Sequence, residues 1–200
     1  YEEVNLNVGC PSGTVVSKGK GAGMLRSPEE LDRFLEAVFR ECPMDISVKT
    51  RLGVETPEEF EKIMAVFNRY PIKELTIHPR VRKQFYDGAV YMEMFDYAAK
   101  NSANPLCYNG DILNLSQAEA LKAKYPQIQS IMIGRGLIAD GGGLVGVDVV
   151  LDGELTGGDD AFGLVTDVEQ HLVAVDLDDR AFDDVAIVEV LDRGVDGGEE

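Results

Sequence analysis

The chain has 200 residues, of which 44% are hydrophobic, and its mean hydropathy of -0.10 is typical of a globular protein. No run approaches the roughly 18–20 consecutive apolar residues of a membrane helix, and no secretory signal pattern is found. We therefore expect a cytoplasmic protein that does not contact the membrane. The three cysteines form no C-x-x-C pair, which argues against a disulfide framework and a zinc knuckle.

The net charge of -17 argues against nucleic-acid binding, but the acidic residues are concentrated in one part of the chain. Residues 1–139 contain 17 basic and 18 acidic residues, whereas residues 140–200 contain 2 and 18. We therefore divide the chain into a first segment, 1–139, and an acidic tail of low diversity, 140–200. The tail has alternating runs at 144–151 and 171–177 that are compatible with strands. A reading-frame error in a G-rich gene is the other explanation for its composition.

The first segment alternates between strand and helix patterns. Ser27 is expected to cap a helix at Pro28, with Glu30 closing a capping box, and Thr56 begins a second helix by the same pattern. Further helices are expected from Met92 to Lys100 and after Ser116. Five strands are predicted between these helices, at residues 4–8, 46–50, 74–78, 105–109 and 130–134. This alternation predicts consecutive right-handed βαβ units and a parallel sheet.

Polar residues gather where each predicted strand ends. In order they are Asn7 and Cys10, Lys49 and Arg51, His78 and Arg80, Asn109 and Asp111, and Arg135. A βα barrel builds its site from all the loops at this edge, whereas a doubly wound sheet binds ligands mainly at one switch point. Polar groups after all five strands therefore favour an α/β fold that is part of a TIM (β/α)8 barrel.

Cys10 and His78 are the candidate reactive residues. Cys10 stands between Gly9 and Pro11 at a strand end, where a proton donor or nucleophile is a stronger interpretation than a buried hydrophobic residue. His78 ends a strand beside Arg80, which favours contact with an anion or a base over a structural role in the core. Two histidines do not support a His-rich metal site, so we expect no metal.

Three glycine-containing loops are candidates for ligand contact. The segment 13–23 lacks the spacing of a nucleotide P-loop and is expected to be a mobile loop that lets backbone approach a ligand. Gly110 and Gly134 follow the last two strands. In barrels, such loops often cradle a phosphate with backbone N–H groups, and the alternative is that each is only a turn that needs glycine.

Five motifs in the first segment resemble those of the tRNA-dihydrouridine synthases, in the same order. They are residues 5–11 (NLNVGCP), 48–53 (VKTRLG), 75–80 (LTIHPR), 108–112 (YNGDI) and 131–136 (IMIGRG). The resemblance covers about residues 1–139. It implies an FMN-binding TIM barrel that reduces the C5–C6 double bond of uridines in tRNA, with NADPH as the reductant. The family barrel is followed by a helical RNA-binding domain, and the resemblance implies that three strands and this domain are missing here.

The resemblance also implies roles for the residues of these motifs. Cys10 would be the general acid that protonates C5, and Asn7 and Arg80 would bind the substrate. The implied FMN-binding residues are Lys49, His78, Asn109, Gly110, Asp111, Gly134 and Arg135.

Two alternatives stay open at this point. A related FMN barrel could act as a dehydrogenase on free pyrimidines, since it would share the flavin and its phosphate cradle. The chain could also be an inactive fragment that binds RNA or a partner through its Lys and Arg side chains. The oligomeric state is not predicted.

Overall fold

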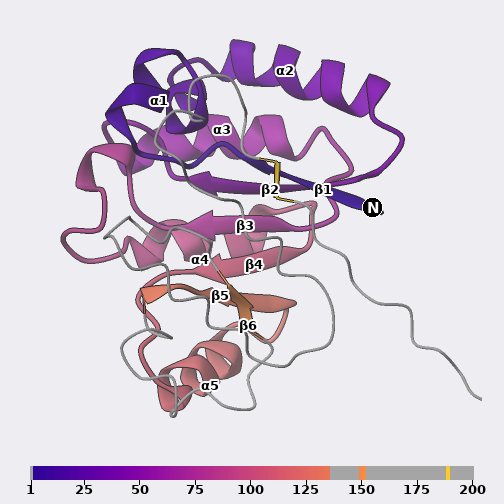
Figure 1. Cartoon of the computed structure of the whole chain (residues 1–200). Helices are drawn as coiled ribbons and strands as arrows, with labels where there is room; N and C mark the ends of the chain where they lie inside the picture. Colours follow the sequence, from indigo (N-terminus) through magenta and orange to yellow (C-terminus); the bar gives the residue numbers. More distant parts are fainter. Residues whose placement is uncertain (1, 136–148, 152–187, 190–200) are drawn as a thin grey trace, which may run out of the picture.

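The computed structural model describes residues 2–135, 149–151 and 188–189, and the fold is built on the first of these ranges. Its central feature is one sheet of seven strands in the order β6-β5-β4-β3-β2-β1-β7 (Figure 1). The strands are β1 (Glu3–Asn7), β2 (Asp45–Arg51), β3 (Leu75–His78), β4 (Leu106–Asn109), β5 (Ser130–Ile133), β6 (Val149–Leu151) and β7 (Val188–Glu189). The five strands expected from the sequence are thus confirmed, with ends shifted by at most one residue.

Strands β1 to β5 are parallel and lie side by side in chain order. The sixth strand continues the sheet in parallel next to β5, and it falls within the run 144–151. The seventh pairs antiparallel with β1 at the opposite edge. The other candidate run of the tail, 171–177, lies outside the described residues. The α/β class and the parallel βα alternation are confirmed, in agreement with part of a TIM barrel.

Helices connect the parallel strands. The α-helices are α1 (Gly13–Ser17), α2 (Pro28–Glu41), α3 (Phe60–Phe67), α4 (Met92–Asn101) and α5 (Leu115–Lys124), and the 3-10 helices are η1 (Gly21–Arg26), η2 (Pro57–Glu59) and η3 (Arg82–Gln84). Right-handed connections between strands that advance in one direction place α2 to α5 on a single face of the sheet. In Figure 1, α3 and α4 lie behind it.

The helix termini follow the capping chemistry of the sequence, with one correction. The Ser27 hydroxyl accepts a hydrogen bond from the Glu30 N–H at 3.2 Å, as expected for an N-cap. In η2, the Glu59 carboxylate accepts the N–H group of Thr56 at 3.0 Å, as a capping box requires. The helix predicted to begin at Ser116 is instead capped by Asn114, whose side chain accepts the Gln117 N–H at 3.0 Å. Asparagine is an equally good cap, and the helix therefore begins earlier.

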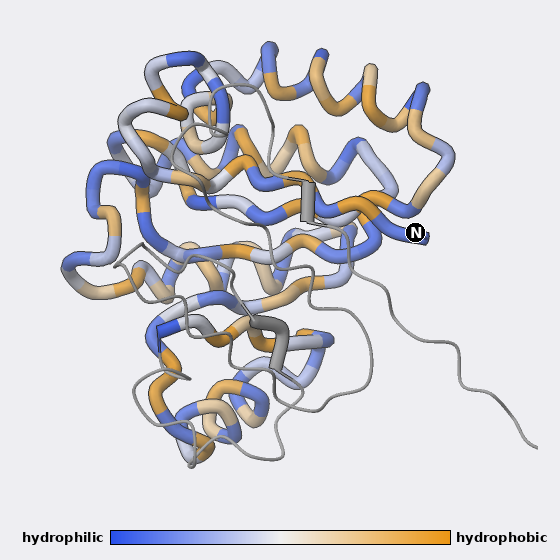
Figure 2. Tube along the Cα trace, in the orientation of Figure 1, coloured by the Kyte–Doolittle hydropathy of each residue, from blue (hydrophilic) through white to orange (hydrophobic). Residues whose placement is uncertain are grey.

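The two faces of the sheet differ in chemistry. On the helix-covered face, Tyr108 of β4 packs edge-to-face against Phe95 of α4, with ring centroids 4.9 Å apart. The buried apolar side chains of the strands alternate onto this face and form the core: Val4, Leu6, Ile46, Val48, Leu75, Ile77, Leu106, Ile131 and Ile133. The helices turn their apolar stripe toward it, as the orange side of α2 in Figure 2 illustrates.

The opposite face of the sheet carries polar side chains. Ser47 of β2 donates a hydrogen bond to the Glu3 carboxylate of β1, and Lys73 forms an ion pair with Glu3 at 3.0 Å. Ser130 of β5 donates to Glu74 at 2.6 Å across the sheet. Because side chains alternate along a strand, the same face carries Asn7, Lys49, His78 and Asn109 at the carboxyl ends. The polar face therefore leads to the predicted site.

Among the residues described, no helix is long and apolar enough to cross a membrane.

Candidate active site

Cys10 is buried directly after β1, in a turn that its neighbours hold in place. The Asn7 side-chain oxygen accepts the Gly9 N–H at 3.0 Å, and the Cys10 carbonyl accepts the Ala22 N–H at 2.9 Å. A side chain at Gly9 would meet the Thr50 backbone at 3.1 Å, so the glycine lets β1 approach β2 closely at this point. Residues 8–11 therefore form a turn that these hydrogen bonds hold in place, and Cys10 is buried in it.

The glycine-rich segment 13–23 differs from the loop expected. It contains α1 and the first half of η1, and Gly21 and Gly23 pack closely against protein atoms, whereas Gly13 and Gly19 are exposed. At Gly21, with φ of 53°, a Cβ would lie 2.9 Å from the Cys10 carbonyl oxygen and 3.0 Å from the Cys10 Cβ. At Gly23 it would lie 2.8 Å from the Val16 carbonyl. These glycines bring the segment onto Cys10.

His78 lies at the end of β3 and is 5% exposed. Burial, followed by the positive charges of Arg51, Lys49, Arg80 and Arg135, lowers the pKa of His78 to about 2. The imidazole is therefore neutral at physiological pH. Because Arg80 Nη1 can only donate, His78 Nε2 accepts this hydrogen bond of 3.1 Å and the ring proton resides on Nδ1. Four cations around one neutral ring create a positive field at this edge of the sheet.

Arg80 organises the loops after β3 and β4. Its side chain is buried and forms a forked pair with the Asp111 carboxylate, with Nη1 3.0 Å from Oδ1. Its Nη2 donates to the Gly88 carbonyl at 2.5 Å. Arg135 Nη2 donates to Asp111 Oδ1 at 2.8 Å, which links the loop after β5 to the same carboxylate. Arg80, ahead of the other charges, holds the pKa of Asp111 below its usual value.

The two glycines expected to cradle a phosphate, Gly110 and Gly134, directly precede Asp111 and Arg135 in the chain, and Asn109 precedes Gly110. The Asn109 amide donates to the Met132 carbonyl at 3.1 Å, which ties the ends of β4 and β5 together. A Cβ at Gly110 would lie 2.2 Å from the Tyr108 hydroxyl, so packing against Tyr108 alone is sufficient to require this glycine. Gly134 directly follows β5 and is half-buried. Gly136, the last residue of the fifth motif, lies outside the described residues.

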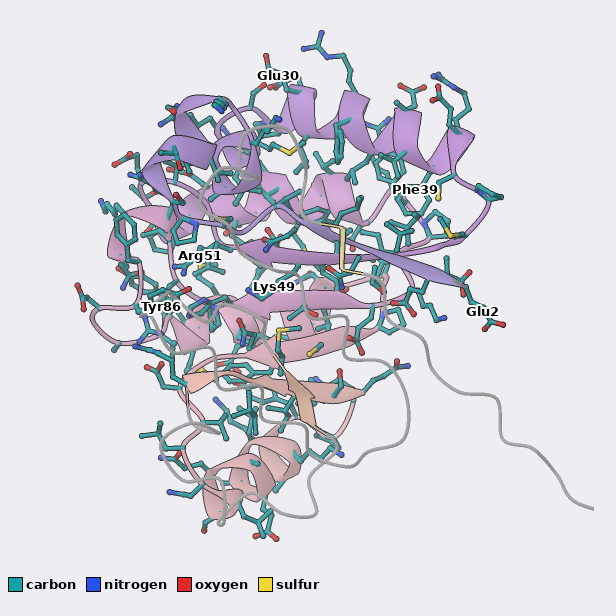
Figure 3. All side chains as sticks on the ribbon, viewed as in Figure 1. Glu2, Glu30, Phe39, Lys49, Arg51 and Tyr86 are labelled. Atoms are coloured by element: carbon teal, nitrogen blue, oxygen red, sulfur yellow. The ribbon has the colours of Figure 1, made fainter. Side chains whose placement is uncertain are left out.

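Tyr86 is not among the residues that the sequence places at the site, and Arg51 is placed at a strand end there but is given no role. The Tyr86 ring lies 6.2 Å from the His78 ring and lies beneath the guanidinium groups of Arg51 at 5.3 Å and Arg135 at 4.9 Å. Arg51 donates from Nε to the Gly9 carbonyl at 3.0 Å, so it also joins the Cys10 turn to this cluster. Figure 3 shows Lys49, Arg51 and Tyr86 toward the same end of the sheet. In the sequence, the feature that could have pointed to Tyr86 was the aromatic pair Phe85-Tyr86 within an otherwise polar loop.

The predicted residues thus come from five consecutive strand ends of one sheet. Asn7, Lys49 and Thr76 occupy one row of the strand register, and His78 pairs in register with Arg51. In the described part of the chain, no three His, Cys, Asp or Glu side chains are grouped as a metal ion would require.

Comparison with known proteins identifies the family. The model of the family "Dihydrouridine synthase (Dus)" matches residues 1–154. The chain is 32% identical over 143 residues to a "Probable tRNA-dihydrouridine synthase" of Staphylococcus aureus, which covers 68% of this chain and 43% of that protein. The same description applies to similar proteins of Staphylococcus epidermidis, 33% identical over 144 residues (68% of this chain, 43% of that protein), and Rickettsia bellii, 30% identical over 135 residues (66% and 41%).

The chain therefore spans less than half the length of these relatives. The family model covers more than three quarters of the chain and includes every strand from β1 to β5, together with all the candidate site residues. On this match, the chain belongs to the dihydrouridine synthase family.

Proposed function

We propose that this chain carries the flavin- and uridine-facing part of a tRNA-dihydrouridine synthase. Residues 1–139 would form a partial FMN-binding barrel, and residues 140–200 an acidic tail whose strands β6 and β7 pair with the two edges of its sheet. The reaction would be the NADPH-dependent reduction of the C5–C6 double bond of uridine in tRNA. The observation that carries the proposal is the buried Cys10 in a turn joined by Arg51 to the His78 cluster.

The donor set of the site fits FMN in its chemistry. A phosphate and a ring that gains negative charge on reduction are both favoured by the four cations around His78, whose pKa is lowered first by burial and then by these charges. The proposed FMN ligands are Lys49, His78, Asn109, Gly110, Asp111, Gly134 and Arg135. When bound, FMN supplies the hydride that is added to C6 of the uracil, and NADPH restores it.

The chain's own residues would supply the proton and the orientation of the base. Cys10 would donate its thiol proton to C5, so that one hydride and one proton complete the two-electron reduction. The Asn7 side-chain oxygen accepts the Gly9 N–H, which leaves its amide group to donate to a uracil carbonyl. Arg80 is held by Asp111 and Gly88, and its role would be to keep the substrate side of the pocket positively charged.

The test separates flavin binding from proton donation. The 200-residue chain is reconstituted with FMN, its visible spectrum is recorded, and dihydrouridine is measured in an unmodified tRNA transcript after addition of NADPH. The variant Cys10→Ala is expected to keep its flavin and to lose turnover by roughly 10²- to 10⁴-fold, the usual contribution of a general acid. The control is Cys42→Ala, which changes a cysteine at the C-cap of α2.

Three results would contradict the proposal. Undiminished turnover by Cys10→Ala would remove Cys10 from the reaction. Reduction of free uracil or orotate, with none of tRNA, would favour the dehydrogenase that acts on free pyrimidines. Binding of tRNA by a protein that takes up no flavin would favour the inactive RNA-binding fragment.

A further inference from the structure

Phe85 stands out because its side chain is directed to solvent from the loop that carries the site. It is 43% exposed, and Leu113 is the other large hydrophobic residue that is exposed in the described part of the chain. The next residue, Tyr86, contacts His78, Arg51 and Arg135. Of these two consecutive aromatic residues, Tyr86 therefore packs on the site and Phe85 is exposed to solvent. Phe85 thus lies directly outside the site whose inner aromatic residue is Tyr86.

The backbone of Phe85 has a conformation that a bulky residue rarely adopts. With φ of 51°, it is the one non-glycine residue at positive φ among those described. Surrounding hydrogen bonds impose this conformation. The Phe85 N–H donates to the Arg82 carbonyl at 3.0 Å, and its carbonyl accepts Arg51 Nη1 at 2.6 Å. Strain of this kind persists only where the surroundings enforce it, and it is concentrated at functional sites.

Arg82 connects the Phe85 ring to the Cys10 turn. Its guanidinium lies over the ring, 5.2 Å from the centroid, and its Nε donates to the Pro11 carbonyl at 3.1 Å. Pro11 directly follows Cys10 in the chain. An exposed aromatic ring stacked with an arginine is therefore held beside the thiol turn, in a form suited to a base and its phosphate.

We propose that Phe85 is a stacking platform for an unpaired base of the RNA substrate, next to the uridine that is reduced. The inference rests on the proposed function and adds a residue that binds RNA outside the flavin pocket. Uridine within a folded RNA must leave its stack to reach a buried thiol, and the neighbouring bases are then unstacked. Aromatic side chains bind such bases through their π faces, whatever the sequence. Phe85 would supply this face, and Arg82 a positive charge for the adjacent phosphate.

The test measures RNA affinity separately from chemistry. Binding of an unmodified tRNA transcript is measured by fluorescence anisotropy at one fixed salt concentration, because affinity for RNA varies with salt. Phe85→Gly is expected to bind roughly 5- to 150-fold more weakly, the range for losing one stacked base. Phe85→Tyr keeps the ring and should bind like the wild type. Leu113→Ala removes the other exposed hydrophobic side chain and should leave affinity unchanged.

Glycine adopts a positive φ without strain, which offsets part of what is lost with the ring and its contact with Arg82. A thermal melt of each variant is recorded, and Phe85→Gly should be folded at the assay temperature while binding RNA more weakly. Wild-type affinity in Phe85→Gly, or equal losses in Phe85→Gly and Leu113→Ala, would overturn the inference. A wild type that binds the transcript but forms no dihydrouridine would contradict the proposed function and leave the Phe85 comparison valid. A wild type that does not bind the transcript would overturn both.

Discussion

His78 makes a sharp prediction about how stability depends on pH. Its pKa is about 2 in the folded protein, whereas an unfolded histidine titrates near 6.5. Between these values the unfolded chain binds the extra proton, so the free energy of unfolding falls as the pH is lowered. For a folded pKa this low, linkage gives a loss of about 2 kcal/mol between pH 7 and pH 5 from this residue alone.

The perturbation is His78→Gln, which keeps a polar side chain but cannot take up a proton. Urea titrations at pH 7 and pH 5 measure the change in unfolding free energy for the wild type and the variant. Replacing the ring lowers stability at both pH values, and this cost cancels when each protein is compared with itself. The variant should lose about 2 kcal/mol less than the wild type between the two pH values.

If His78→Gln lost as much unfolding free energy between pH 7 and pH 5 as the wild type does, His78 would not be the source of the pH dependence. The burial of its ring, together with the positive charges of Arg51, Lys49, Arg80 and Arg135 around it, would then not lower its pKa as inferred.

Two further substitutions test the geometry of the site. Asp111→Asn removes the carboxylate from Arg80, which is 1% exposed, and should lower the unfolding free energy by about 2 kcal/mol in urea titrations at pH 7. Breaking a fully buried ion pair costs roughly 3–5 kcal/mol, and we expect less here because Asp111 is partly exposed; a loss below about 0.5 kcal/mol would contradict the pairing. Gly21→Ala forces a Cβ against the Cys10 carbonyl at positive φ and should cost about 1–3 kcal/mol in thermal melts. Gly13→Ala meets nothing closer than 4.0 Å and should cost less than 0.5 kcal/mol by the same measurement, about the size of an ordinary surface change; equal losses would refute the packing argument.

The strands and their order could be predicted because the signals are local. Each strand is a short run of alternating or apolar residues, and the caps at Ser27 and Thr56 depend on residues three positions away. Parallel order then follows from the right-handed connection. The helix after β4 shows how small the error is, since Asn114 caps it in place of Ser116 by the same chemistry.

The contacts of the loops could not be predicted in this way. The position of Tyr86 under Arg51 and Arg135 depends on three segments that meet only in the folded chain. Gly21 could not be interpreted from sequence either. A glycine is needed at this position because it packs against the Cys10 turn, and no ligand is required to explain it. Sequence spacing identifies which residues follow a strand, but tertiary packing decides which way each one points.

The chemistry of the sheet faces explains how five separate strand ends can contribute to one candidate site. A doubly wound sheet is covered by helices on both faces, and its strands are then apolar on both sides. Here the face opposite the helices carries Glu3, Ser47, Glu74 and Ser130, joined by hydrogen bonds across the strands. The order β1 to β5 also contains no reversal that would create a switch point. The carboxyl ends therefore make one continuous rim, which is why residues as far apart in the sheet as Cys10 after β1 and Arg135 after β5 can serve the same ligand.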